Sequence, residues 1–345
     1  MEEVAIVRAL VLMKAIPPTK GHDALLEFAH TYASHGLVLM DTAQGEPMVS
    51  ARVGWLRRRV RGMMPHWDFK HIWFEPQFDT EPYFWDMWKD EFDKLGHFDV
   101  VIGSEAYCQK VADLIGATYI PFDPDREMVN TKASVIRQFP RSTFKNISPT
   151  FQHNLVTTVT IWGAESTGKT TLSKDLALRT RSHYVLEWAR PYLETVGTEI
   201  NIKSMTDIWN GQRALQDQSH FWLDRPAIIQ DTDLFSTVGY WEQPHWADQL
   251  GPVPNKLIED AHYFKSDLYI ITKSNIPFEV DPLRYGGDHR ESDDAYWIDI
   301  ADKYGLNYVV LESADHRDRL HEATVLTNAA VDDRLRVLDF DRRGA

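Results

Sequence analysis

The stretch Gly163-Ala164-Glu165-Ser166-Thr167-Gly168-Lys169-Thr170 matches G-x-x-x-x-G-K-[ST] at every fixed position. It follows the apolar run Val156 to Trp162 and precedes a helical pattern from Thr171 to Arg179. A strand, this loop and a helix, in that order, are the context that a phosphate-binding loop requires. A glycine-rich turn of chance sequence is the alternative, and the flanking strand and helix argue against it. The stretch therefore predicts a nucleoside triphosphate site on an α/β domain.

Each part of this loop has an expected role. Its two glycines allow the backbone to wrap so that N–H groups and the N-terminus of the following helix point at phosphate oxygens. Lys169 is expected to reach the β- and γ-phosphates as a catalytic residue, and the Thr170 hydroxyl to help hold Mg²⁺. The predicted ATP-binding residues of this half are Gly163, Glu165, Ser166, Thr167, Gly168, Lys169, Thr170 and Thr171.

Length and composition bound the class of protein. A chain of 345 residues is long for a single core, so two domains are expected. Contents of 43% hydrophobic and 26% charged residues are those of a soluble globular protein. The single cysteine, Cys108, excludes an internal disulfide and suits a reducing cytoplasm, which is the predicted location.

The charge and the apolar runs exclude further classes. A net charge of −14 argues against a general nucleic-acid binder. No apolar run approaches the length of a membrane span, and the acidic start Met1-Glu2-Glu3 is unlike a signal peptide. The predicted partners are therefore small molecules, with neither nucleic acid nor membrane among them. The sequence makes no prediction of the oligomeric state.

The first half alternates strand and helix patterns. Strands are predicted at 5–13, 36–40, 71–74, 99–102 and 118–121, and helices at 22–34, 51–61, 83–94 and 107–115. Strands separated by single helices imply parallel crossovers and a doubly wound sheet. Residues Gln138 to His153 contain Pro140 and Pro149 and lack a clear period, so we expect them to link two domains.

A second α/β series starts at Val156, with further strands predicted at 227–230, 268–272 and 307–311. The last residues are rich in Asp and Arg and are predicted to be a solvated tail. The predicted fold class is therefore α/β, with two doubly wound parallel-sheet domains. Their predicted bounds are residues 1–140 and 154–331, with a linker at 141–153 and a charged tail at 332–345.

The first predicted strand ends in Met13-Lys14-Ala15-Ile16-Pro17-Pro18-Thr19-Lys20-Gly21-His22, and a helix follows. This run resembles the [T/H]-x-G-H signature of the nucleotidyltransferase α/β-phosphodiesterase superfamily, whose loop lays a basic and imidazole surface against the phosphates of ATP. His22, at a helix N-terminus, can donate to a phosphate oxygen whose charge rises in the transition state. A threonine that only caps the helix is the structural alternative.

Later segments resemble the same superfamily in the same order, namely Met48 to Arg57, Val101 to Tyr107, Leu114 to Ala117, Asp123 to Arg126 and Lys132 to Arg137. Taken with the phosphate loop, this order resembles the NadR family. In that family a Rossmann-like nicotinamide-mononucleotide adenylyltransferase is fused to a P-loop ribosylnicotinamide kinase. The resemblance runs from about Ala5 to about Val331. No helix-turn-helix pattern precedes the first predicted strand, so no operator binding is expected.

The first half departs from the family pattern at three places. Met13-Lys14-Ala15 stands where the family has Gly-Lys-Phe, Thr19 where it has His, and Thr131-Lys132 where it has Ile-Ser. These changes leave open a first domain that senses nucleotide without catalysis. The resemblance otherwise implies catalytic roles for Lys14, His22 and Arg137, phosphate contacts for Thr19, Gly21 and Ser134, and substrate contacts for Gly103, Ser104 and Glu105.

In the second half, the run Ala227-Ile228-Ile229-Gln230-Asp231-Thr232-Asp233 is an apolar strand that ends in two acids. P-loop kinases place carboxylates for Mg²⁺ and for the attacking hydroxyl at this point. By resemblance, Asp231 would hold Mg²⁺ with Thr170 or orient the ribose 5′-hydroxyl, and Asp233 would assist, both as catalytic residues. The sequence leaves open which acid does which. A carboxylate that merely caps the next helix is the structural alternative.

Two more segments of the second half carry predictions. Glu187-Trp188-Ala189-Arg190 resembles the E-[YW]-x-R segment of the family, so Glu187 and Arg190 are expected to bind substrate, or alternatively to form a structural ion pair. The segment Leu283 to Arg290 contains Gly286-Gly287, which can absorb backbone changes. It is predicted to be a lid whose Arg284 and Arg290 close on the phosphates, with a solvent-facing turn as the alternative.

The resemblance implies two linked reactions. The second domain would phosphorylate ribosylnicotinamide to nicotinamide mononucleotide (NMN) with Mg-ATP. The first would join NMN to the adenylyl group of ATP, giving NAD and pyrophosphate. The implied ligands are ATP, NMN, ribosylnicotinamide, NAD and Mg²⁺. The alternatives are a kinase with a non-catalytic, nucleotide-sensing first domain, and a P-loop kinase for another nucleoside.

Overall fold

The computed structural model describes residues 7–75, 80–81, 83–221, 223–279 and 290–340, with only the backbone of residues 290–293. The predicted lid residue Arg284 lies outside these ranges, and so does the side chain of Arg290. The chain divides into two compact units. One comprises Met1–Asn154 with Leu335–Ala345, and the other comprises Leu155–Arg334.

A five-stranded parallel sheet forms the centre of the first unit. Its order is β3-β2-β1-β4-β5, where the strands are β1 (Arg8–Met13), β2 (His35–Thr42), β3 (Trp67–Trp73), β4 (Val100–Gly103) and β5 (Thr118–Pro121). Ala9 of β1 lies opposite Gly36 of β2 and Val100 of β4. The sheet is doubly wound, as predicted, and the direction of winding reverses at β1. In such sheets ligands bind outside the carboxyl ends of the strands at the reversal.

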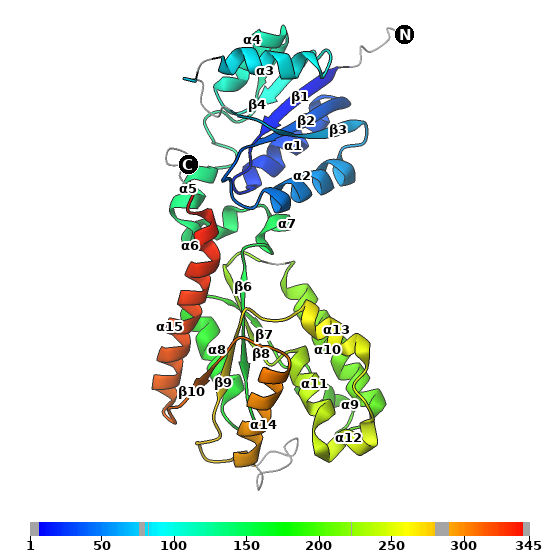
Figure 1. Ribbon diagram of the computed structural model, residues 1–345, viewed down its shortest axis with the longest axis vertical. Coiled ribbons are helices and arrows are strands. Elements are labelled where there is room, and N and C mark those ends of the chain that lie inside the picture. Colours follow the sequence, from blue (N-terminus) through cyan, green and yellow to red (C-terminus); the bar gives the residue numbers. More distant parts are fainter. Residues whose placement is uncertain (1–6, 76–79, 82, 222, 280–289, 341–345) are drawn as a thin grey trace. The chain divides into compact units, whose positions relative to one another are not determined.

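Helices cover both faces of this sheet (Figure 1). One face carries α1 (Lys20–Tyr32) and α2 (Val49–Met63), and the other carries α3 (Phe84–Asp93) and α4 (Tyr107–Ile115). Leu10 and Leu12, alternate residues of β1, pack in one cluster with Trp88 of α3 and Val111 of α4. Burial on both faces explains why the inner strands β1, β2 and β4 are apolar runs, whereas the edge strand β3 is partly exposed and alternates polar and apolar residues.

Residues 141–153, for which the sequence predicts a linker, are folded within the first unit. Phe144, Ile147 and Phe151 are completely buried, and the backbone N–H of Ser148 donates to the carbonyl of Pro18 at 3.0 Å. Helices this short give no readable period, so the pattern alone suggested an irregular segment. The elements here are α5 (Ala133–Gln138), α6 (Pro140–Thr143), η1 (Phe144–Asn146) and α7 (Pro149–Gln152).

The second unit contains a second five-stranded parallel sheet. Its order is β10-β9-β6-β8-β7, where the strands are β6 (Thr157–Trp162), β7 (His183–Val185), β8 (Ala227–Asp231), β9 (Leu268–Thr272) and β10 (Tyr308–Leu311). The predicted fold class, two doubly wound parallel-sheet α/β domains, is confirmed. Only β7 lacks a predicted counterpart, because three residues carry too short a pattern.

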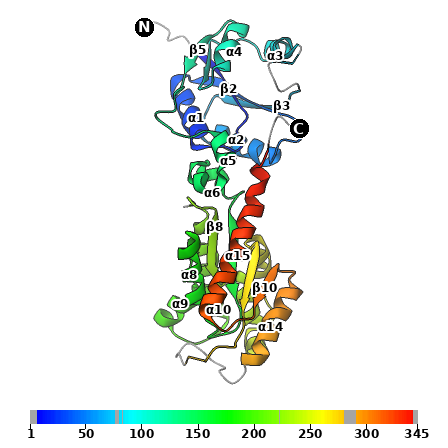
Figure 2. The same ribbon diagram turned by 90° about the vertical axis from the view of Figure 1, so that its left-hand side faces the viewer.

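Two layers of helices enclose this sheet. On one face, α8 (Lys169–Thr180) and α15 (His316–Leu335) share a buried cluster with the strands. Figure 2, viewed from that side, shows α15 in front of the strands. The other face carries α10 (Ile202–Ser219), α11 (Leu234–Glu242), α13 (Asn255–Tyr263) and α14 (Arg290–Lys303). Two shorter helices, α9 (Ala189–Val196) and α12 (Pro244–Leu250), complete the unit.

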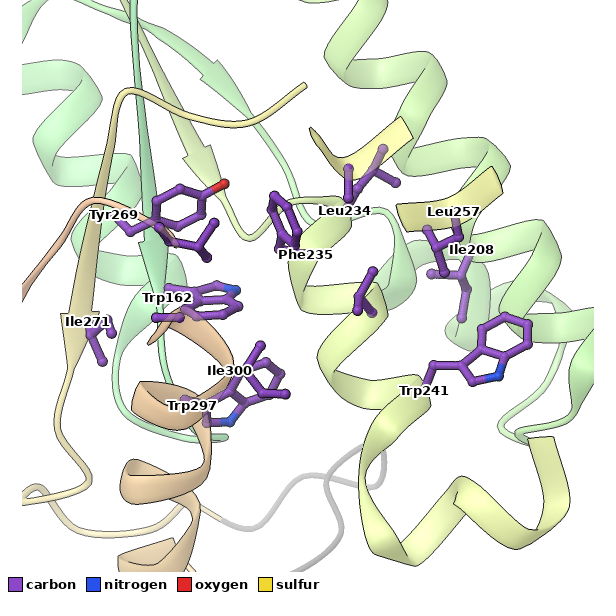
Figure 3. Close-up of a cluster of buried hydrophobic side chains, with 14 of the residues drawn as sticks. Trp162, Ile208, Leu234, Phe235, Trp241, Leu257, Tyr269, Ile271, Trp297 and Ile300 are labelled. Atoms are coloured by element: carbon purple, nitrogen blue, oxygen red, sulfur yellow. The ribbon is translucent and has the colours of Figure 1, made fainter. Parts of the chain in front are cut away.

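Aromatic side chains fill the core on that second face (Figure 3). The Trp162 ring of β6 lies 5.0 Å from the ring of Trp297 in α14 and 5.6 Å from that of Tyr269 in β9, both measured between centroids. These edge-on contacts fix the end of β6, from which the phosphate loop continues. Many of the tryptophan side chains therefore pack in the core.

Part of the segment for which the sequence predicts a solvated tail is helical. α15 continues to Leu335, and η3 (Arg336–Leu338) follows it, so the predicted tail is helical up to Leu338, which is buried. None of the helices in the described part of the chain combines the length and apolarity that a membrane crossing requires.

Candidate active sites

The first unit has a cavity of about 630 Å³ at the carboxyl ends of β1 and β4, where the winding of the sheet reverses. All nine residues that the sequence proposes for this half line it. They are Lys14, Thr19, Gly21, His22, Gly103, Ser104, Glu105, Ser134 and Arg137. The fold thus gathers three segments that are separate in sequence around one cavity.

His22 is held by a capping interaction at the start of α1. The backbone N–H of Thr19 donates to Nδ1 of His22 at 3.0 Å, and the Thr19 hydroxyl accepts from the backbone N–H of His22 at 3.3 Å. Since an amide N–H can only donate, Nδ1 is the acceptor and the ring proton sits on Nε2. Burial, followed by the charges of Arg126 and Arg52, lowers the pKa of His22 to about 4. The cavity is therefore lined by a neutral imidazole with one N–H to donate.

Two carboxylates that sequence reasoning missed hold Lys14. Its Nζ lies 2.7 Å from Asp41 and 3.5 Å from Glu46, and Glu46 also pairs with the buried Arg52 at 2.9 Å. Arg52 further donates to the backbone carbonyls of Lys14 and Pro47. A signal for Asp41 was present, because it follows the apolar run of β2 at the carboxyl end of a parallel strand. This network fixes both the side chain and the backbone of Lys14.

Further cations line the first cavity. Arg137 donates to the carbonyl of Ile16 at 2.6 Å, and Arg126, a residue with no assigned role in the sequence analysis, pairs with Glu105. Lys132, one of the departures from the family pattern, also lines the cavity. Thr131 places there a buried hydroxyl that has no hydrogen-bond partner. Cations and unsatisfied donors around a concave surface are suited to phosphate groups.

The second unit has a cavity of about 560 Å³ beside the phosphate loop. Ten of the residues proposed from the sequence line it: Glu165, Ser166, Thr167, Gly168, Lys169, Thr170, Thr171, Glu187, Arg190 and Asp233. In the described part of the chain, Gly163 and Asp231 lie outside this lining, and Asp231 is 2% exposed. The predicted substrate segment and the loop thus face the same hollow.

The loop is held closely against the end of β9. Gly163 has φ 130°, and a Cβ there would lie 2.6 Å from the carbonyl oxygen of Thr272, which explains the need for glycine. The hydroxyls of Thr167 and Thr272 lie 2.7 Å apart. Lys169 begins α8 and donates to the carbonyl of Ala164 at 2.7 Å across the loop. Backbone N–H groups at the start of α8 therefore border the cavity.

Asp231 and Thr170 form the candidate metal site. Burial raises the pKa of the Asp231 carboxyl, while a hydrogen bond from Thr170 and the charge of Lys169 act in the opposite direction. Oδ1 of Asp231 is buried with no hydrogen-bond partner. An orphaned carboxylate oxygen beside a hydroxyl fits Mg²⁺, which takes oxygen ligands and relies on few protein groups. Within the described residues no cluster of three His, Cys, Asp or Glu offers another metal site.

Asp233 has a different environment. It caps α11, where its Oδ1 accepts from the backbone N–H of Ser236 at 3.2 Å, and its Oδ2 accepts from the hydroxyl of Tyr269 at 2.6 Å. Burial raises the pKa of Asp233 to about 6. Both oxygens already accept from protein donors. Asp233 thus caps the helix that follows β8, which is the structural alternative that the sequence analysis gave for an acid at this strand end.

The substrate side of the second cavity includes residues that the sequence did not reveal. Gln212 is 2% exposed, and its Oε1 accepts from the backbone N–H of Trp188 at 2.9 Å. That donor fixes the orientation of the amide, and Nε2 is left buried with no hydrogen-bond partner at the cavity wall. Arg190 pairs with Glu194 at 3.4 Å within α9. No sequence signal marks Gln212, which lies in the middle of a long helix.

Comparison with known proteins places these observations in context. The AAA domain family matches residues 158–319. The trifunctional NAD biosynthesis/regulator protein NadR of Salmonella typhimurium is 24% identical over 336 residues, covering 90% of this chain and 80% of that protein. The protein of the same name from Escherichia coli is 23% identical over 334 residues, with the same coverage.

Two solved structures show the same fold. A crystal structure of NadR protein in complex with NR superposes with a TM-score of 0.61 at 20% identity, covering 95% of this chain and 96% of that one. A crystal structure of NadR protein in complex with NAD and AMP-PNP gives a TM-score of 0.61 at 18% identity, covering 96% of each chain. The similarity in sequence and in fold extends across both units.

Proposed function

This chain is a homologue of the NadR proteins, and we propose from that premise that it catalyses two successive steps of NAD biosynthesis. In the first step the second unit phosphorylates ribosylnicotinamide to NMN with Mg-ATP. In the second step the first unit transfers the adenylyl group of ATP to NMN, giving NAD and pyrophosphate. The observation that carries the proposal is that each unit has its own cavity lined by its own phosphate motif.

In the kinase step the chain positions phosphates and neutralises charge. The phosphate loop and the N-terminus of α8 would receive the β- and γ-phosphates of ATP, and Lys169 would turn from the carbonyl of Ala164 toward them. Thr170 and Asp231 would hold Mg²⁺, which neutralises charge on the phosphates when bound. Oδ1 of Asp231 has no hydrogen-bond partner, and this supports Asp231 rather than Asp233 as the residue that would hold Mg²⁺.

Glu187 and Gln212 are our candidates for the acceptor side. Glu187 lines the cavity at the carboxyl end of β7, and we propose that it accepts the proton of the ribose 5′-hydroxyl. We assign Asp233 to holding the start of α11, since both its oxygens already accept hydrogen bonds. The unsatisfied amide N–H group of Gln212 would donate to the carboxamide oxygen of nicotinamide.

In the transferase step, no protein nucleophile is needed. NMN attacks the α-phosphorus of ATP, and the pyrophosphate leaves, so catalysis consists of orientation and stabilisation of charge. The Nε2–H of His22 would donate to an α-phosphate oxygen, and Lys14 and Arg137 would hold the neighbouring phosphates. The fixed tautomer of His22 and the anchored backbone of Lys14 support a preorganised site.

One observation favours the second candidate function, in which the first unit only senses nucleotide. Two carboxylates surround Lys14, so part of its charge is already compensated. The experiment that separates the candidates is incubation with Mg-ATP and ribosylnicotinamide, following NMN and NAD separately by chromatography. Formation of both products supports the two-step proposal. Accumulation of NMN without NAD, also when NMN is supplied directly, would restrict the chain to the kinase step.

A further inference from the structure

Arg319, in the first turn of α15, is a buried cation that no step above uses. The side chain is 3% exposed, and all of its acceptors are neutral oxygens. Burying a guanidinium costs free energy unless its donors are satisfied, and an apolar residue of the same volume would avoid that cost. The hydrogen bonds of Arg319 therefore have to offset this cost.

Those hydrogen bonds join three segments that are distant in sequence. Nε donates to the carbonyl of Ser313 at 2.6 Å, Nη1 to that of Thr167 at 2.7 Å, and Nη2 to that of Lys273 at 2.8 Å. Nη2 also donates to the side-chain oxygen of Asn275. Each segment continues into the wall of the second cavity, through Gly168, Ile276 and His316. One planar guanidinium thus ties together three parts of the wall of that cavity.

The contact with Thr167 sets the orientation of a peptide group in the phosphate loop. In a planar trans peptide the C=O and the following N–H point in opposite directions. Because the Thr167 carbonyl points at Arg319, the N–H of Gly168 points away from it. A Cβ built on Gly168 would lie 3.9 Å from Nη1, so the guanidinium lies directly behind the loop. The positive charge also polarises this peptide, which makes its N–H a stronger donor.

We propose that Arg319 is a positioning residue for nucleoside triphosphate binding and transfer. It aims the Gly168 N–H at the phosphates and holds the segments of Ile276 and His316 against the phosphate loop, without itself entering the cavity. The inference rests on the proposed function in one respect, that this loop receives ATP. A lysine could supply the charge, but its three N–H groups sit on one nitrogen and cannot reach the acceptors that Nε, Nη1 and Nη2 of Arg319 meet separately. We therefore expect Arg319→Lys to lose as much kinase turnover as the uncharged Arg319→Met.

The test compares Arg319→Met and Arg319→Lys with the wild type in the full chain. We expect kinase kcat to fall about 100-fold in both, as for a misplacement of the reacting groups by about 1 Å, with a small change in KM for ribosylnicotinamide. Adenylyl transfer from supplied NMN should be unchanged. Val331→Ala, which removes buried volume from the same helix, is the matched control. It should lower the Tm without lowering kinase kcat.

Near-normal kinase kcat in both Arg319 variants would overturn the proposal, and so would a comparable loss of kcat in Val331→Ala. Calorimetric binding of Mg-ATP separates this proposal from the proposed function. If the wild type binds Mg-ATP but phosphorylates no ribosylnicotinamide, the kinase assignment fails, and weaker Mg-ATP binding by Arg319→Lys still supports the positioning role. In that case, equal Mg-ATP affinities of the wild type and of Arg319→Lys would overturn the positioning role. A wild type that binds no Mg-ATP would overturn both.

Discussion

The backbone N–H of Thr19 donates to Nδ1 of His22 across 3.0 Å, and this contact leaves Nε2–H as the single donor of the ring. His22→Gln keeps an acceptor for Thr19 but shortens the reach into the cavity. We expect NAD formation from supplied NMN to fall by about 10²–10³-fold, the loss typical of removing one transition-state donor. Phosphorylation of ribosylnicotinamide is the internal control. A variant with unchanged transferase turnover would show that His22 does not touch the reacting phosphate.

The burial of His22, together with the charges of Arg126 and Arg52, gives a pH dependence of stability. The pKa of His22 is lowered from 6.5 to about 4, so the unfolded chain binds more protons than the folded one between these values. Its contribution to stability is therefore present above pH 6.5 and is lost as the pH falls toward 4. Urea unfolding across this window should show a steeper loss for the wild type than for His22→Gln. Equal slopes would mean that the folded ring titrates normally.

Lys169→Ala should abolish kinase activity while leaving adenylyl transfer near normal. In the proposed kinase step Lys169 would neutralise charge on the transferred group, and the two cavities belong to different units. The measurement is NMN formation from ribosylnicotinamide and, separately, NAD formation from NMN. Lys203→Ala, which removes an exposed lysine paired with Asp207, is the control and should affect neither. Equal loss of both activities in Lys169→Ala would contradict two independent sites.

Gln212→Leu should raise KM for ribosylnicotinamide. The substitution removes the buried Nε2 donor. A site built to hydrogen-bond its ligand binds that ligand much less well when the hydrogen bond cannot form. We expect an increase in KM of about 10-fold, corresponding to one neutral hydrogen bond of about 1.4 kcal/mol, with KM for ATP unchanged. Steady-state kinetics with each substrate varied in turn provides the measurement. An equal rise in both KM values would point to a general disturbance of α10.

Glu46→Ala should destabilise the first unit. It leaves the buried guanidinium of Arg52 without its carboxylate, and breaking a buried pair costs about 3–5 kcal/mol. Arg52 keeps its carbonyl partners, so we expect the lower end of this range. Asp93→Ala breaks an exposed pair with Lys89 in the same unit, which is worth about 0–1 kcal/mol. Urea unfolding of both variants tests the difference, and equal stabilities would contradict it.

The sequence predicted the candidate sites best where one short motif supplies the whole geometry. The phosphate loop could be placed because its glycines, lysine and threonine are consecutive and its flanking strand and helix are apolar and amphipathic. The end of β8 could be placed for a similar reason, since parallel strands bring their carboxyl ends to one edge. The different environments of Asp231 and Asp233 could not be predicted, because they depend on the distant Tyr269 and on the start of α11.

What the sequence by itself determined is the pair of doubly wound sheets, and it also placed the two segments proposed to bind phosphate. These follow from local patterns, namely apolar strand runs, helical spacing and glycines at fixed positions. The tertiary structure alone decided which polar and charged groups meet: Lys14 with Asp41 and Glu46, Gln212 with the backbone of Trp188, and Arg319 with carbonyls of three loops. The physical reason is that hydrogen bonds and ion pairs act over a few ångströms in space, and chain folding brings together residues up to 152 positions apart.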